Sequence, residues 1–204
     1  VIFFNDIKRT DKQKGIFGEV NVDLSDTVEL TVGARWYDIE VDFEGSANSS
    51  FGNGFGNTDQ QRFGSNLSAQ YAPGNANGYP DTAQTDGVIG KATLAWNKSE
   101  DVMYYVTWSE GFRPGLLNRP VGSSNADGSY VVKPEVKSDE VTNLEFGWKT
   151  VLRDGKLRFN GSAFMVDVSG LQSTIFDPSI VNLFFSDNAA DADITGLEGD
   201  FVYY

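Results

Sequence analysis

Long stretches of this chain place an apolar residue at every second position. The clearest stretch is residues 28–36, where Val, Leu, Val, Ala and Trp alternate with Glu, Thr, Gly and Arg. A period of two puts alternate side chains on opposite faces of a β-strand. Helical spacing is almost absent. The sequence therefore predicts an all-β chain whose strands carry one apolar and one polar face.

The connections between these stretches alternate between short and long. Short turns are expected at about 25–27, 99–101 and 153–155, and long loops at about 45–86, 113–137 and 172–190. The strands between them run to roughly 11–15 residues, whereas soluble proteins typically use about 5–6. Long two-faced strands with short turns at one end and long loops at the other are typical of outer-membrane barrels. We expect an antiparallel meander of about seven or eight long strands, part of a transmembrane β-barrel.

The apolar phase changes once within a strand. After Trp36 and Tyr37 the apolar positions become Ile39, Val41 and Phe43. Such a change indicates either a β-bulge or a strand that leaves one environment for another. A strand that projects beyond the bilayer would show the second behaviour.

Aromatic residues near strand ends are candidates for the two membrane interfaces. By position along the strands, Trp36 and Phe112 are expected near the outer interface, and Trp96 and Tyr104 near the inner one. The same count puts Trp108 and Trp148 nearer the middle of the membrane, where they do not support an aromatic girdle.

Composition removes several functional classes. The chain has 16 Lys and Arg against 29 Asp and Glu, a net charge of −13, and no Cys or His. A strongly acidic chain lacks the basic face that nucleic acid requires. Without Cys and His there are no disulfides, thiolate sites or Ser-His-Asp arrangements. We expect no cofactor, no metal site and no enzyme. The acidic group Asp187, Asp191 and Asp193 is interpreted as a solvated loop rather than a calcium site.

Two alternatives remain from the residues alone. A secreted β-sandwich could bind glycans through loop aromatics, and a glycoside hydrolase could use a carboxylate pair, although no acidic pair stands out. The barrel and the sandwich differ in where they put one set of side chains. A barrel exposes this set to lipid and a sandwich encloses it: Val20, Val22, Leu30, Val32, Leu94, Val106, Phe146 and Phe159.

Several segments resemble the barrel domain of TonB-dependent outer-membrane receptors. They are residues 17–20 (FGEV), 30–35 (LTVGAR), 108–115 (WSEGFRPG), 133–135 (KPE), 138–149 (SDEVTNLEFGWK), 154–164 (DGKLRFNGSAF), 188–190 (NAA) and 194–198 (ITGLE). No single segment is specific, but their order along the predicted strands is. The resemblance covers nearly all of residues 12–204.

The resemblance implies a 22-stranded transmembrane barrel closed by an N-terminal plug. Such receptors lie in the bacterial outer membrane and import scarce nutrients, often ferric siderophores, with energy passed through TonB. Residues 1–204 would then be a partial barrel domain, without plug or TonB box, and the chain reads as cut at both ends. The implied partners are outer-membrane lipid, TonB through the missing plug, and a small-molecule substrate such as a ferric chelate.

Five residues are candidates for substrate contact. Arg113 and Arg119 flank the start of a long loop and could hold an anionic chelate, and Asn118 lies in the same segment. Phe51 and Phe55 are aromatics in an otherwise polar loop. The alternative for Arg113 is an ion pair with a lumen carboxylate such as Glu110 or Glu145. The alternative for the two phenylalanines is a small loop cluster.

Overall fold

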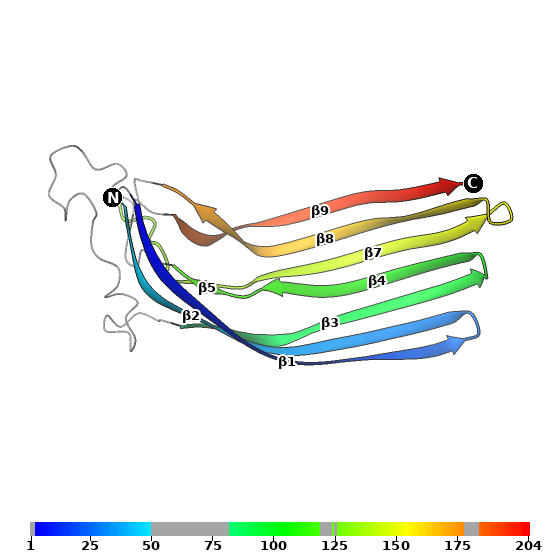
Figure 1. The fold of residues 1–204 in the computed structure, drawn as a ribbon, viewed down its shortest axis with the longest axis horizontal. Coiled ribbons are helices and arrows are strands. Elements are labelled where there is room, and N and C mark those ends of the chain that lie inside the picture. The colour runs from blue at the N-terminus through cyan, green and yellow to red at the C-terminus, as the bar shows by residue number, and fades with distance from the viewer. Residues whose placement is uncertain (1–2, 50–81, 119–123, 125, 178–183) are drawn as a thin grey trace.

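The computed structural model describes residues 3–49, 82–118, 124, 126–177 and 184–204, and they form strands joined by turns (Figure 1). The strands are β1 (Phe3–Ser25), β2 (Val28–Ser49), β3 (Thr82–Ser99), β4 (Val102–Arg113), β5 (Leu116–Leu117), β6 (Glu135–Val136), β7 (Asp139–Leu152), β8 (Leu157–Ile175) and β9 (Phe185–Tyr203). None of the described residues belongs to a helix long and apolar enough to span a membrane.

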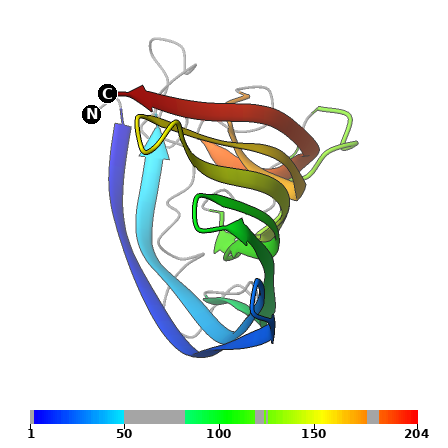
Figure 2. The same cartoon turned by 90° about the vertical axis from the view of Figure 1, so that its right-hand side faces the viewer.

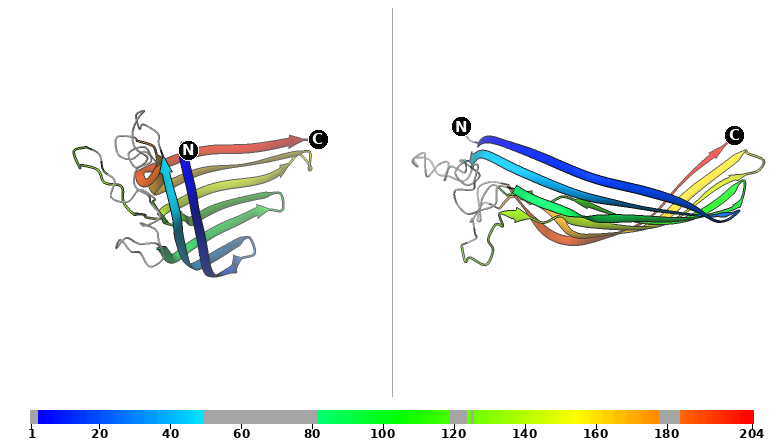
Figure 3. Two further views of the ribbon diagram at one scale, coloured as in Figure 1. Left: turned by 60° about the vertical axis from the view of Figure 1, so that its left-hand side comes forward. Right: turned by 90° about the horizontal axis from the view of Figure 1, so that it is seen from below.

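Seven strands form one antiparallel sheet in the order β1-β2-β3-β4-β7-β8-β9. This is the expected meander, interrupted only by the small β5–β6 pair between β4 and β7. No second large sheet packs on it within the described residues, and its edge strands β1 and β9 do not pair with each other, so the sheet is not closed on itself. Figures 2 and 3 show how strongly the open sheet curves. The marker side chains Val20, Val32, Val106 and Phe146 are between 43% and 63% exposed. The β-sandwich alternative is therefore wrong.

The strands run further than their apolar alternation indicates. β2 continues to Ser49 and β3 begins at Thr82, inside the expected loop 45–86. The expected loop 172–190 likewise contains the end of β8 and the start of β9, and loop 113–137 contains β5 and β6. Polar cross-strand pairs extend the ladder beyond the apolar region. One of them joins Lys12 Nζ to Glu40 Oε1 at 2.7 Å.

The short turns lie where the sequence predicts them. They join Ser25 to Val28, Ser99 to Val102 and Leu152 to Leu157. In the third turn, Arg153, Asp154 and Gly155 have left-handed φ values of 55°, 54° and 85°, and the Lys156 N–H donates to the Arg153 carbonyl at 3.2 Å, which closes a tight turn around Asp154 and Gly155.

The phase change in β2 is a change of environment and not a bulge. The pairing of β2 with β1 and with β3 continues without a break through Trp36 and Tyr37. Before this point the outward side chains are exposed, as Val32 (47%) and Trp36 (41%) show. After it the opposite face is buried, with Ile39 at 6% and Val41 at 2%.

The buried face of β2 is the concave one. Arg9 and Val41 from β1 and β2 line the same cavity as Thr174 and Phe185 from β8 and β9. These strands lie at opposite sides of the sheet order, so their side chains can meet only inside its curve (Figure 2). The polar residues Glu19, Arg35, Lys91 and Glu145 share this face by register, so the prediction of a concave polar face is confirmed for the part of the sheet nearer the short turns.

Trp148 lies in the aromatic row near the short turns, contrary to the expectation from residue counting. The register pairs Trp96 with Tyr104, and Tyr104 with Trp148. The Trp96 and Tyr104 rings are 5.8 Å apart, and Trp148 is 5.7 Å from Phe159 on β8. Counting along one strand fails because neighbouring strands are staggered, so only the pairing gives the height of a residue.

Phe112 does not face outward as expected of an interface aromatic. Its ring stacks on Tyr37 at a centroid distance of 3.8 Å and an interplanar angle of 17°. The pairing of β3 with β4 ends at Lys91 and Ser109, and beyond it the Gly90 N–H donates to the Glu110 carboxylate instead. β4 is thus free of β3 where Phe112 turns toward the concave face.

Candidate functional site

The long-loop end of the sheet contains the buried core of the described residues. Its centre is Tyr37, Ile39 and Val41, with Phe112 and Ile89 packed against it. Other buried apolar residues come from the connection between β4 and β7, from the start of β3 and β9, and from β8: Leu117, Val132, Val136, Ala83, Phe185 and Val168. β5 contacts β2 and β3, while β6 contacts β9. The connection between β4 and β7 therefore folds inward over the long-loop end of the concave face, which we call the mouth.

An ion pair fixes the two ends of this connection. The Arg113 guanidinium donates from Nε to Asp139 Oδ2 at 2.7 Å and from Nη2 to the same oxygen. The backbone N–H groups of Arg113 and Gln172 also donate to this carboxylate. Burial alone would raise the pKa of Asp139, but these hydrogen bonds, led by that of Arg113, hold its pKa below the ordinary value.

Arg113 has neither of the two carboxylate partners named in the sequence alternative. Glu110 accepts from the Gly90 N–H, and Glu145 accepts from the Tyr105 hydroxyl at 2.6 Å. Asp139 could not be recognised from the sequence as the partner of Arg113, because it opens β7 opposite the end of β4, a relation that only the register shows.

Asn118 connects three segments and is 3% exposed. Its Nδ2 donates to the carbonyls of Lys133 (2.9 Å) and Ser186 (2.6 Å), and its Oδ1 accepts from the Ser186 N–H at 2.7 Å. Its amide is thus engaged by backbone on both sides. In this structure Asn118 holds the β4–β7 connection against the start of β9.

Asp187 is a buried acceptor rather than a solvated acid. It is 7% exposed and accepts from the Tyr130 hydroxyl at 2.7 Å and from Lys133 Nζ at 3.1 Å. Burial opposes its ionisation, but the Tyr130 and Lys133 contacts lower the pKa of Asp187 below the ordinary value. Asp191 is exposed, and the residues that the structure describes include no acidic group arranged to hold a metal.

Two side-chain amides complete the same network. Gln172 Nε2 donates to the carbonyls of Pro114 and Lys137, each at 2.9 Å. Asn188 accepts from the Lys137 N–H and donates to the carbonyls of Lys137 and Gly170. Neither residue was a sequence candidate. The signal available in the sequence is a side-chain amide near a strand end, which can both donate and accept hydrogen bonds. Its partners become known only once the loops are placed.

The remaining sequence candidates are not part of this described network. Arg119, Phe51 and Phe55 lie outside the described residues. Along the concave face toward the short turns, the described side chains form ordinary polar pairs, such as Thr93 with Thr107 at 2.9 Å. The described residues thus form a mouth braced by hydrogen bonds and ion pairs, and below it a polar concave face that extends toward the short turns.

Comparison with known proteins identifies this architecture. The profile of the family described as "TonB dependent receptor-like, beta-barrel" matches residues 3–204. The chain belongs to this family. Members of the TonB-dependent receptor family are bacterial outer-membrane proteins that act as transporters and not as enzymes. A search of curated proteins finds no match.

Solved structures of TonB-dependent receptors share the fold at low sequence identity. The ferric yersiniabactin uptake receptor FyuA from Yersinia pestis is 15% identical, with a TM-score of 0.63 over 96% of this chain and 24% of its own. The copper transporter OprC is 17% identical, with a TM-score of 0.64 over 96% of this chain and 27% of its own. The FrpB iron transporter from Neisseria meningitidis is 17% identical, with a TM-score of 0.60 over 98% and 24%. The chain spans about a quarter of the length of these receptors.

Proposed function

We propose that residues 1–204 form part of the wall of an outer-membrane receptor that takes up a scarce nutrient, a ferric siderophore or a similar chelate, with energy supplied through TonB. The observation that carries the proposal is the pairing of an exposed apolar face with a polar concave face on one open sheet. Outer-membrane lipid would cover the first face, and the second would line the lumen.

The substrate class is supported by what receptors of the same fold are named for. A receptor bound to ferripyoverdine and the ferric-catecholate receptor Fiu share the fold with this chain. In our proposal Arg119, Phe51 and Phe55 are the substrate-contact candidates. Arg113 and Asn118 act on binding indirectly, because they fix the loop that borders the mouth.

The test is uptake by whole cells that carry or lack the full-length receptor. Cells under iron restriction would be given a panel of ⁵⁵Fe-labelled hydroxamate, catecholate and carboxylate siderophores, with and without TonB. We expect one chelate class to be taken up only when both receptor and TonB are present. Unchanged uptake of every chelate in receptor-deficient cells would contradict the iron assignment. A receptor recovered from the soluble fraction would contradict the membrane assignment as well.

A further inference from the structure

A cavity of about 350 Å³ opens on the concave face below the braced mouth. It is formed by β1 to β4 and is lined by Asp11, Gln13, Arg35, Ile39, Val41, Ile89, Gly111, Phe112 and Pro114. Its volume lies at the lower end of the range for small-molecule sites, about 300–1,000 Å³. One side is apolar and aromatic, and the other carries the polar side chains of β1 and β2.

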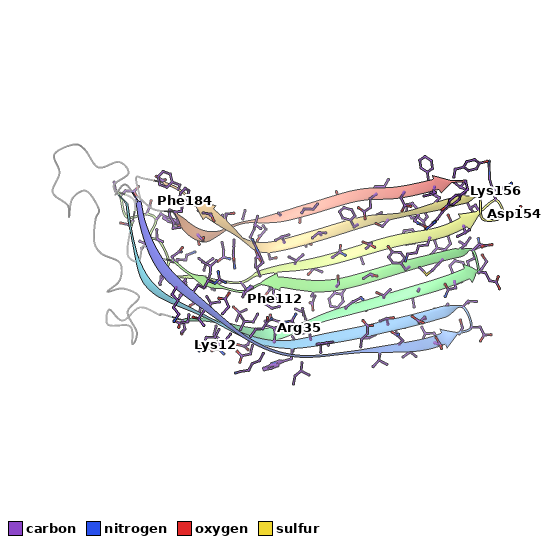
Figure 4. The ribbon with its side chains drawn as sticks, viewed as in Figure 1. Lys12, Arg35, Phe112, Asp154, Lys156 and Phe184 are labelled. Carbon is purple, nitrogen blue, oxygen red and sulfur yellow. The ribbon has the colours of Figure 1, made fainter. Side chains whose placement is uncertain are left out.

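Arg35 lines this cavity on the side nearer the short turns. Its backbone pairs with Phe17, but its guanidinium reaches the next row, where a Cβ on Gly15 would lie 3.5 Å from Nε. Gln13, one alternate position further, faces the same space. Figure 4 labels Arg35 and Phe112, two of the residues that line the cavity.

The Arg35 guanidinium has no acidic partner among the described residues. The acid in the cavity, Asp11, is already paired with Arg9 at 2.7 Å. The cavity therefore presents a planar cation with unused donors beside the apolar surface of Ile39, Ile89 and Phe112.

We propose that this cavity is a subsite for a carboxylate carried on a planar apolar body. Arg35 would bind the carboxylate through two parallel N–H donors, a geometry that lysine cannot reproduce. Gln13 would supply a further donor, and Phe112 with the two isoleucines would cover the apolar body. This subsite rests on the proposed receptor function, because it takes the concave face to be the ligand-bearing lumen.

The test uses the full-length receptor in a non-ionic detergent and 4-fluorobenzoate as the probe, followed by ¹⁹F NMR titration. We expect saturable binding that Arg35→Gln weakens by about tenfold to a hundredfold, since a hydrogen bond to a charged group is worth about 1.5–3 kcal/mol. Arg35→Lys should recover only part of the loss. The neutral probe 4-fluorobenzamide should bind equally to the native receptor and to Arg35→Gln.

Arg158→Gln is the matched control, because Arg158 lies on the same face near the short turns and donates to the Tyr204 hydroxyl. It should leave binding of the probe unchanged. Equal affinity in the native receptor and Arg35→Gln, or an equal loss in both arginine variants, would overturn the subsite. So would a native receptor that does not bind the probe but loses thermal stability on Arg35→Gln, since Arg35 would then pair within the protein. Normal chelate uptake alongside any of these results would leave the transport proposal standing.

Discussion

The indole ring of Trp148 covers Gly161 on the neighbouring strand, and a Cβ added to that glycine would lie 2.3 Å from Cζ2 of the ring. Three further cross-strand pairs share this arrangement: Tyr37 over Gly87, Tyr105 over Gly147 and Phe164 over Gly196. In each pair the ring occupies the space of the absent side chain. These four glycines therefore serve packing, and the rings shield backbone that glycine alone would leave bare.

Gly161→Ala is expected to destabilise the sheet by about 1–3 kcal/mol, the usual cost of overpacking. The added methyl would also lie 2.8 Å from the carbonyl oxygen of Glu198, so a rotation of Trp148 cannot relieve it. Gly18→Ala is the control, because a Cβ there meets nothing within 4 Å. Thermal unfolding of the receptor in detergent measures both. Equal midpoints for the two variants would contradict the packing role.

Asn118→Asp is expected to loosen the loop that borders the mouth. The change keeps the shape of the side chain but replaces both donors with an oxygen facing the carbonyls of Lys133 and Ser186. A buried polar group left without its hydrogen-bond partner costs about 1–3 kcal/mol. Hydrogen exchange should speed up in residues 116–118 and at Ser186 without any substrate present. Unchanged exchange would show that Asn118 does not hold these segments.

Asp139→Asn is expected to release the ion pair with Arg113 and to open the β4–β7 connection. Asp139 is 1% exposed but the Arg113 side chain is 54% exposed, so solvent screens the pair and the loss is about 1–3 kcal/mol, mainly from the hydrogen bonds to the carboxylate. The control is Asp154→Asn, the same change in an exposed short turn. Hydrogen exchange across residues 113–118 and 139–141 should report the difference. Similar exchange in both variants would contradict the bracing role of Asp139.

The mouth is expected to loosen only in strong acid. Asp139 and Asp187 both have pKa values held below the ordinary 3.8, so the stability that their ionised carboxylates give to the mouth is fully present above that pH. It is lost as the pH falls below 3.8 through the lower folded-state pKa values. A nitroxide label at Lys137, an exposed position in the network, should keep one mobility from pH 7 to pH 4 and gain a mobile component below. A mobile component already present at pH 5 would contradict this assignment.

The sheet could be predicted from sequence because its period is a local property. Alternation in β2, β4 and β7 fixed the faces, and the turn at Arg153 carried its own signal in Asp154 and Gly155. The height of Trp148 and the direction of Phe112 could not be predicted, because both depend on pairing between strands. Asp139 was missed as the partner of Arg113 for the same reason. The brace at Asn118 joins residues 68 positions apart in the chain, which no local pattern reports.

The most direct test of the account is the environment of neighbouring side chains on β4 and β7. Single cysteines introduced at Val106, Thr107, Glu145 and Phe146 would carry nitroxide labels in the full-length receptor in lipid, with any native cysteine outside these 204 cysteine-free residues replaced first. We predict that labels at Val106 and Phe146 are accessible to oxygen and shielded from a water-soluble nickel chelate, and that labels at Thr107 and Glu145, on the opposite face, do not show this combination. Loss of this alternation, or access of the nickel chelate to Val106 and Phe146, would contradict a wall with one face in lipid.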